Sequence, residues 1–374
     1  MKKTLAAVAV LGAFAGSALA ADVTLYGKVD LGLQYKSVNP DVTGVDSQDS
    51  WGMNSGNSAS SRFGLKGTEQ ISEDLTVGFQ LENGLYADSG KLKGSKDGRL
   101  FDRESRLFVK TNYGEIGMGR MGNLNSGNGT YGIMGAASAF GAAWGNALGG
   151  HETTFGFGGS RYDNTVTYKS PTFGGVTVYA QYVMGEDTME NKSKTDRYAA
   201  LGATFDYDAL HAVLVVDQMN EKHTAGTPDA DDAFTVSGGV TYDFGVVKTG
   251  LTAQYFKDVN SITSQGLNYA GSAYTDGKVA GQWKGYGVAL SASAPVFGGT
   301  LAGIVGYLDA ENDEDGFTGV DGDKDFTRYN VAATYMYPLS KRTSLYAGAG
   351  YMQDEVYGVK GDYTEVVAGI VHNF

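Results

Sequence analysis

The stretch VTLYGKVDLGLQY (residues 23–35) alternates apolar and polar side chains with a period of two. One face carries Val23, Leu25, Val29, Leu31 and Leu33, and the other carries Thr24, Lys28, Asp30 and Gln34. A period of two predicts a β-strand with one apolar face. The pattern recurs to the C-terminal stretch AGIVHNF (368–374), which ends on the aromatic Phe374. An apolar strand that stops on an exposed aromatic residue is explained if the apolar face contacts lipid.

The first twenty residues, MKKTLAAVAVLGAFAGSALA, have the form of a secretory signal peptide. Two lysines precede a short apolar segment, and Ala18-Leu19-Ala20 forms a cleavage site of the small-x-small type. We therefore expect residues 1–20 to be removed and the mature chain to begin at Ala21. No later apolar stretch approaches the ~18 residues of a membrane helix, so any membrane span is expected to be a β-barrel.

Composition narrows the class of protein. Removal of Lys2 and Lys3 leaves 27 basic residues against 42 acidic ones, a formal net charge of −15. This charge argues against nucleic acid as a partner, because nucleic-acid binding needs a basic surface. The chain has no cysteine, and its 56 glycines and 24 tyrosines suit strands that close into a barrel and end in aromatic girdles.

The connections between predicted strands alternate between short turns and long polar loops. The short turns are 71–74, 171–175, 295–299 and 338–342, and the long loops include 37–59, 88–100, 258–280 and 312–325. This asymmetry is typical of outer-membrane barrels. We predict an all-β fold: one transmembrane antiparallel β-barrel of 16 strands over residues 21–374. The alternative is a secreted β-sandwich, which would bury its apolar faces.

Several stretches resemble the trimeric general porins of Gram-negative bacteria, particularly the beta-proteobacterial and neisserial type. They are VTLYGKVDLGLQY (23–35), SRFGLKGTEQISEDLTVGFQLENG (61–84), GEIGMGRM (114–121), NTVTYKSPTFGGVTVYAQY (164–182) and the final HNF. The resemblance implies a homotrimer in the outer membrane, in contact with lipid and lipopolysaccharide, that passes ions and small hydrophilic solutes. Phe374 resembles the signal that the outer-membrane assembly machinery reads.

A loop of about forty residues, 122–162, interrupts the alternation and is rich in Gly, Ala, Asn and Ser. Long loops without their own secondary structure are usually functional. In the family that the chain resembles, this third loop folds into the barrel and narrows the pore, and we expect the same here. The alternative is a flexible external loop.

Basic side chains are expected on the wall opposite this loop. The resemblance places constriction residues at Lys28, Arg62, Arg120 and Lys169, and alternation adds Arg106. Arg120 shares parity with the apolar Ile116 and Met118, so its inward position requires a bulge. The balancing acids are Glu82, with Asp30 and Glu104 also on the wall, and Glu152, the only acid between Gly122 and Tyr162. We predict a weak to moderate anion preference, with Arg62 and Lys28 as the main contributors.

Other chemistry finds little support in the sequence. The four histidines are scattered, and no nucleophile elbow or phosphate loop is present, so we expect no enzyme activity, no cofactor and no metal. An outer-membrane barrel hydrolase and a substrate-specific channel remain the alternatives. The acidic stretch 309–325 lacks the closing Glu of an EF-hand and is expected to be a solvated external loop, with divalent bridging to lipopolysaccharide as the alternative.

Overall fold

The structure, a computed structural model, describes residues 23–94, 98–141, 144, 147–185, 197–220, 231–269, 272 and 277–374. The predicted signal peptide lies outside these residues. The described strands are β1 (Thr24–Pro40), β2 (Gln48–Ser55), β3 (Arg62–Ser72), β4 (Leu75–Tyr86), β5 (Lys91–Leu92), β6 (Glu104–Thr111), β7 (Gly114–Gly122), β8 (Arg161–Lys169), β9 (Val176–Val183), β10 (Arg197–Tyr207), β11 (Leu210–Asn220), β12 (Ala233–Asp243), β13 (Lys248–Thr263), β14 (Lys278–Val296), β15 (Gly299–Asn312), β16 (Asp325–Pro338), β17 (Thr343–Val356) and β18 (Val359–Asn373).

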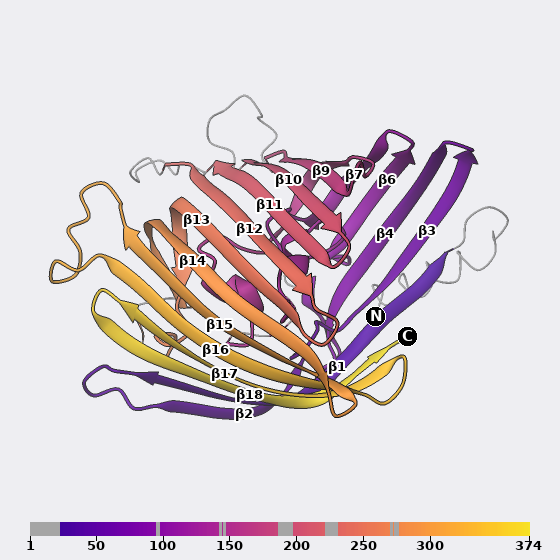
Figure 1. The fold of residues 1–374 in the computed structure, drawn as a ribbon. Coiled ribbons are helices and arrows are strands. Elements are labelled where there is room, and N and C mark those ends of the chain that lie inside the picture. Colours follow the sequence, from indigo (N-terminus) through magenta and orange to yellow (C-terminus); the bar gives the residue numbers. More distant parts are fainter. Residues whose placement is uncertain are drawn as a thin grey trace.

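The strands form a closed antiparallel barrel (Figure 1). Of the eighteen described strands, β2 and β5 are additions to the connections, and the other sixteen form the ring. The ring closes where β18 pairs with β1, from Lys28 opposite Asn373 to Pro40 opposite Gly361. Closure pairs the first and last strands and removes the exposed edges of the sheet. The structure confirms the predicted 16-stranded barrel.

The two faces of the strands have the polarity expected for a barrel in lipid. On β1 the outward side chains of Leu25 and Leu33 are 55% and 57% exposed, while the inward Asp30 is fully buried. On β18 the outward Val366 and Ile370 are 41% and 44% exposed. A secreted sandwich would bury these apolar faces, so that alternative is wrong. No helix of the described residues is long and apolar enough to cross a membrane.

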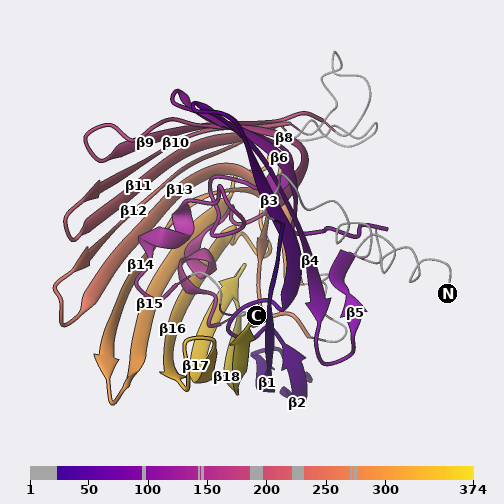
Figure 2. The ribbon, with the colours of Figure 1, turned by 90° about the vertical axis from the view of Figure 1, so that its right-hand side faces the viewer.

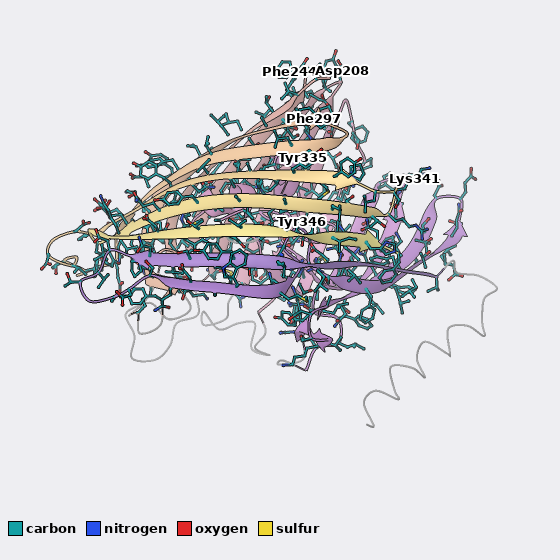
Figure 3. The ribbon with its side chains drawn as sticks, turned by 90° about the horizontal axis from the view of Figure 1, so that it is seen from below. Asp208, Phe244, Phe297, Tyr335, Lys341 and Tyr346 are labelled. Carbon is teal, nitrogen blue, oxygen red and sulfur yellow. The ribbon has the colours of Figure 1, made fainter. Side chains whose placement is uncertain are left out.

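Exposed aromatic residues gather where the short turns lie. Figure 3 shows Phe244 and Phe297, which lie in two of these turns, and Tyr335 toward the same end of β16. The exposed aromatics at this end include Tyr113, Phe173, Tyr207, Phe244, Phe297, Tyr337 and Phe374. The backbone of Phe374 exchanges two hydrogen bonds of 3.0 Å with Gly27, and its ring covers the face of Gly27 where a Cβ would lie. Such a girdle is typical of the membrane interface of a barrel.

The pairing of β1 with β3 ends part of the way along β1, and this point is called the division of the wall. These two strands pair over Thr24–Lys28 and Arg62–Lys66, and Lys28 opposite Arg62 is the final pair. Beyond it, residues 31–38 of β1 pair with β2 instead. The segment 37–59, expected to be a loop, therefore begins with the end of β1 and contains β2. The division is where two bases of the candidate site lie.

The loop between β7 and β8 (L3) is described over residues 123–141, 144 and 147–160, and these residues lie inside the barrel (Figures 1 and 2). It includes the short 3-10 helices η2 (Met134–Ala137) and η3 (Gly150–Thr154). Leu124, Tyr131, Ile133 and Met134 of L3 pack against inward side chains of β9–β11 in one buried cluster. The prediction that the third loop folds into the pore is confirmed, and the external-loop alternative is wrong.

Candidate functional site

The first part of L3 is attached to the wall by hydrogen bonds from its backbone and side chains. The Leu124 amide donates to the Gln181 side chain at 3.1 Å, and the Asn125 amide group donates to Thr235 at 3.1 Å. Thr235 in turn donates to the buried Asp217 at 2.5 Å. Buried polar groups are costly unless they are hydrogen-bonded, so inward polar residues of the strands fix where L3 can lie.

The middle of L3 reaches the opposite wall. The Ala139 amide donates to Ser291 at 3.0 Å, and the Ala147 amide donates to Glu365 on β18 at 3.0 Å. Near the start of the loop, the Tyr131 hydroxyl donates to Glu115 at 2.6 Å. Burial and this carboxylate raise the pKa of Tyr131 above its ordinary value. L3 therefore crosses the barrel and is attached on both sides.

Two bases are brought together at the division between β1 and β3. Lys28 and Arg62 are opposite each other in the β1–β3 register. The chain that leads into β3 is held there by Asp30, whose carboxylate accepts the Ser58 and Ala59 amides at 2.8 and 2.7 Å. The inward direction of Lys28 follows from the alternation that also turns Asp30 inward. The register thus sets two cations side by side.

Glu82 on β4 lies between two arginines. Its carboxylate is 3.4 Å from Arg62 Nε and 2.6 Å from Arg103 Nε. It also accepts the Tyr26 hydroxyl at 3.1 Å. Lys28 makes no ion pair with any residue that the structure describes. One carboxylate therefore offsets part of the charge of two guanidinium groups, while Lys28 lies in the same lining without an ion pair among the described residues.

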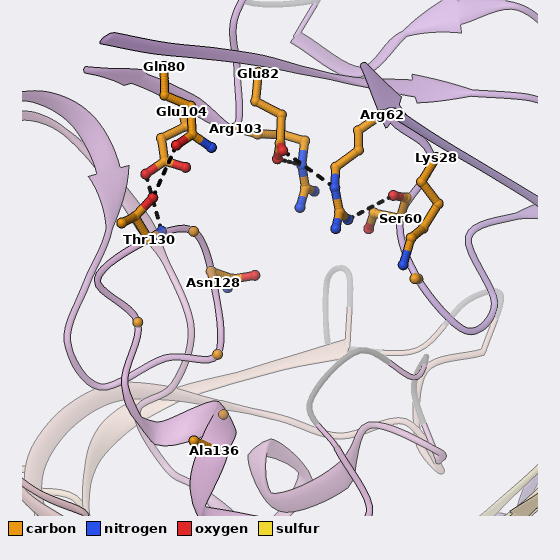
Figure 4. A pocket seen from close by; sticks show the side chains of 15 residues that line it. Lys28, Ser60, Arg62, Gln80, Glu82, Arg103, Glu104, Asn128, Thr130 and Ala136 are labelled. Atoms are coloured by element: carbon orange, nitrogen blue, oxygen red, sulfur yellow. Dashed lines mark hydrogen bonds and ion pairs between the residues drawn. The ribbon is translucent and has the colours of Figure 1, made fainter. Parts of the chain in front are cut away.

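These side chains line a cavity of about 530 Å³ between the wall and L3 (Figure 4). The wall contributes the cations Lys28, Arg62 and Arg103 and the anions Glu82 and Glu104. The L3 residues facing them are uncharged: Gly127, Asn128, Gly129, Thr130, Gly132, Gly135 and Ala136. With all five charged groups ionised, the lining carries a formal charge of +1.

The structure does not bring the other sequence-predicted residues to this cavity. Arg106 is buried under L3, 3.3 Å from Glu104 and 3.4 Å from Glu115. Arg120 lies 2.7 Å from Asp163, at a register shift in β7 that follows Gly119, whose φ of 128° favours glycine. Lys169 is exposed, with its Nζ 5.8 Å from the centre of the Tyr179 ring.

Glu152 belongs to a different part of the pore. It lies in η3 and lines a separate cavity of about 330 Å³ with Trp144 and Arg328. It accepts the Gly127 amide at 3.4 Å, and burial raises its pKa. Its neighbour His151 is completely buried, and burial lowers the pKa of this ring to about 4.

The sequence does not show that Arg103 and Glu104 line this cavity. The sequence predicts Glu104 only as a balancing acid on the wall and makes no prediction for Arg103. Glu104 is opposite Glu82 in the β4–β6 register, and two facing carboxylates require a nearby cation. Arg103 immediately precedes β6, so alternation gives no direction for its side chain. The feature of the sequence that could have indicated both residues is the adjacent basic and acidic pair RE at 103–104.

The comparisons with known proteins agree with this geometry. Residues 6–356 match the family model described as Gram-negative porin. The chain is 31% identical to an outer membrane porin protein of Bordetella pertussis, with all of both chains covered. An anion-selective porin from Comamonas acidovorans is similar in structure, with a TM-score of 0.65, 25% identity, and 95% of this chain and 100% of that chain covered.

The fold is also that of the trimer form of OmpT from Vibrio cholerae, with a TM-score of 0.64, 17% identity, and 95% and 100% of the two chains covered. The family match spans most of the chain, and the barrel, its lipid-facing surface and its inward loop fit it. The chain belongs to the Gram-negative porin family and is an outer-membrane porin.

Proposed function

We propose that this porin is a water-filled channel for ions and small hydrophilic solutes with a weak to moderate preference for anions. The observation that carries the proposal is the cavity beside L3, where Lys28, Arg62 and Arg103 face an uncharged segment of the loop. Fixed charges lining a narrow pore act on ions at short range. The likeness to an anion-selective porin supports the same sign of selectivity.

The negative charge of the whole chain has less influence on selectivity than the charges at the cavity. Exposed charges in the external connections are screened beyond about 8 Å at physiological salt. The lining of the cavity carries the formal charge of +1. We therefore assign selectivity to the cavity. Arg106, Arg120, Lys169 and Glu152 remain part of the proposed pore, with a smaller contribution because their side chains are not among those that line the cavity.

A planar-bilayer measurement tests the proposal. Purified protein is expected to give stepwise conductance, and a reversal potential in a KCl gradient is expected to show anion preference. A cation-selective channel would contradict the assignment of the cavity. A preparation that is silent in the bilayer but hydrolyses lipid or peptide substrates would instead support a barrel enzyme, which the proposal excludes.

The same proposal covers export and assembly. Residues 1–20 act as a cleaved signal peptide, and Phe374 acts as the C-terminal signal for the assembly machinery. The channel is a homotrimer, as supported by the trimer form of the Vibrio cholerae protein with this fold. Conductance steps in groups of three, and a trimer mass in detergent, are the expected observations. A monomer that conducts in single steps would contradict the trimer.

A further inference from the structure

A second loop lies inside the barrel, at the end opposite the short turns. It follows β13 in the connection to β14, and the name L6 is used here for its described residues 264–269. Leu267 is 1% exposed and packs in a buried cluster with Trp283, Phe326 and Val356. L6 therefore leaves β13 and lies against inward side chains of β14, β16 and β17, although the sequence predicted a polar external loop there.

A buried carboxylate fixes the start of L6. Asp354 on β17 is fully buried and accepts hydrogen bonds from the Ser264 hydroxyl at 2.9 Å, the Gln265 amide at 2.9 Å and the Gly266 amide at 3.3 Å. Arg328 on β16 lies 2.6 Å from the same carboxylate. A buried ion pair is stable when such hydrogen bonds satisfy its remaining atoms.

The same arginine contacts L3 directly and L6 through Asp354. Arg328 is 5% exposed, and its Nη1 donates to the Thr153 carbonyl of η3 in L3 at 2.8 Å. Its Nη2 donates to the carbonyl of Thr263, the residue before L6. One guanidinium group thus binds L3, the end of β13 and Asp354. Because Asp354 in turn binds L6, the position of L6 is coupled to that of η3.

L6 separates two cavities. Gln265 lines the cavity of about 330 Å³ that also contains Trp144 and Glu152 of L3. Gln265 also lines a second cavity of about 330 Å³, with Lys36 of β1 and Asp49 of β2. Beside it, the backbone of Gly266 lies against that of Gly361 on β18, so close that a Cβ on Gly266 would overlap the Gly361 carbonyl oxygen.

We propose that L6 is a second size-limiting element of the channel. It lies across the end of the channel where the long loops are, and the Arg328–Asp354 pair holds it against β18 and η3. It divides the entrance into one passage beside L3 and another beside β1 and β2. Arg328 and Asp354 are positioning residues, and Gln265 faces the solutes that pass. This inference rests on the proposed channel function.

The first test uses the absence of cysteine from the chain. Gln265→Cys provides a single thiol, and a charged thiosulfonate reagent is added to an open channel in a planar bilayer. We expect stepwise loss of conductance as each subunit reacts, with recovery on addition of a reductant. Wild-type protein, which has no thiol, controls for the reagent. A Gln265→Cys channel that conducts and is unaffected by the reagent would overturn the proposal.

The second test moves L6 without touching the ion pair. In Gly266→Ala the new methyl group cannot fit against Gly361, so L6 must lift from β18. Liposome swelling is expected to be faster for oligosaccharides that the wild type excludes. Gly52→Ala, where a Cβ meets nothing within 4 Å, is the matched control. Asp354→Asn is also expected to admit larger oligosaccharides. If Asp354→Asn fails to fold, the result for Gly266→Ala alone tests the proposal.

Wild-type conductance is measured first, so that failure of the channel function is distinguished from failure of this inference. If the wild type conducts and folded Gly266→Ala has an unchanged size limit, L6 is only a structural covering. If Gly266→Ala admits larger solutes while its heat stability in detergent stays near that of Gly52→Ala, L6 limits solute size directly rather than through the stability of the barrel.

Discussion

Replacement of Lys28 by Gln is expected to reduce anion preference more than any other single change in the wall, because Lys28 makes no ion pair with the described residues. Gln removes the charge and retains a polar side chain of similar length. Glu82→Gln is the opposite perturbation, since it removes a carboxylate from the same cavity. The two variants are expected to shift selectivity in opposite directions.

The size of the effect follows from the dimensions of the cavity. A sphere of 530 Å³ has a radius of about 5 Å, which we take as the distance from the charged group to a permeating ion. Coulomb's law in water gives about 0.8 kcal/mol at that distance, and screening at 0.15 M salt roughly halves it. An anion and a cation respond with opposite signs, so loss of one charge changes the anion-to-cation permeability ratio by about fourfold.

The assay is the reversal potential in a tenfold KCl gradient across a planar bilayer, for wild type and each variant. Lys28→Gln is expected to bring the potential close to zero, and Glu82→Gln to move it further toward the anion limit. Lys341→Gln is the matched control, because this lysine is exposed in a short turn at the rim (Figure 3). A Lys28→Gln channel whose selectivity equals that of wild type would refute the reasoning, as would equal shifts in Lys28→Gln and Lys341→Gln.

Deletion of residues 133–141, which include η2, is expected to raise single-channel conductance and to admit larger sugars, and an unchanged size limit would contradict the role of L3. The neutral form of His151 is favoured by burial, which lowers its pKa from about 6.5 to about 4. The contribution of this pKa shift to the free energy of unfolding, about 3 kcal/mol at most, is complete above pH 6.5 and is lost as the pH falls toward 4. L3 should be held less tightly at pH 4.5 than at pH 7.5, with larger current noise. Glu152 has a raised pKa and acts in the opposite sense, so His151→Leu, which should reduce the pH dependence, isolates the histidine; noise that is equally pH-dependent in the variant would argue against this origin. Phe374→Ala is expected to lower the yield of folded trimer in the outer membrane without changing the conductance of the channels that form, and a normal yield would show that the terminal ring is dispensable.

Alternation in the sequence predicted the barrel because every strand must present one face to lipid and one to the lumen. The inward direction of Lys28 and Arg62 followed from the same rule, as did the outward direction of Val366 and Ile370. Alternation does not place Arg103 or Glu104 in the cavity. Arg103 lies before β6, so the rule does not apply to it. The place of Glu104 depends on its pairing with Glu82 on the neighbouring strand. Register between strands is a tertiary property, since it depends on which residues of two distant segments are paired.

The sequence by itself determined the class of fold, the closure of β18 on β1 and the presence of a long third loop rich in small residues. These follow from periodicity, from turn length and from an apolar face that has no place in water. Only the tertiary structure decided that Lys28 faces Arg62 at the division of the wall, that Arg106 is enclosed beneath L3, and that L6 lies inside the mouth. Those positions depend on hydrogen bonds between segments far apart in the chain, such as Asp354 with Ser264, and no local pattern specifies which buried acid will meet which loop.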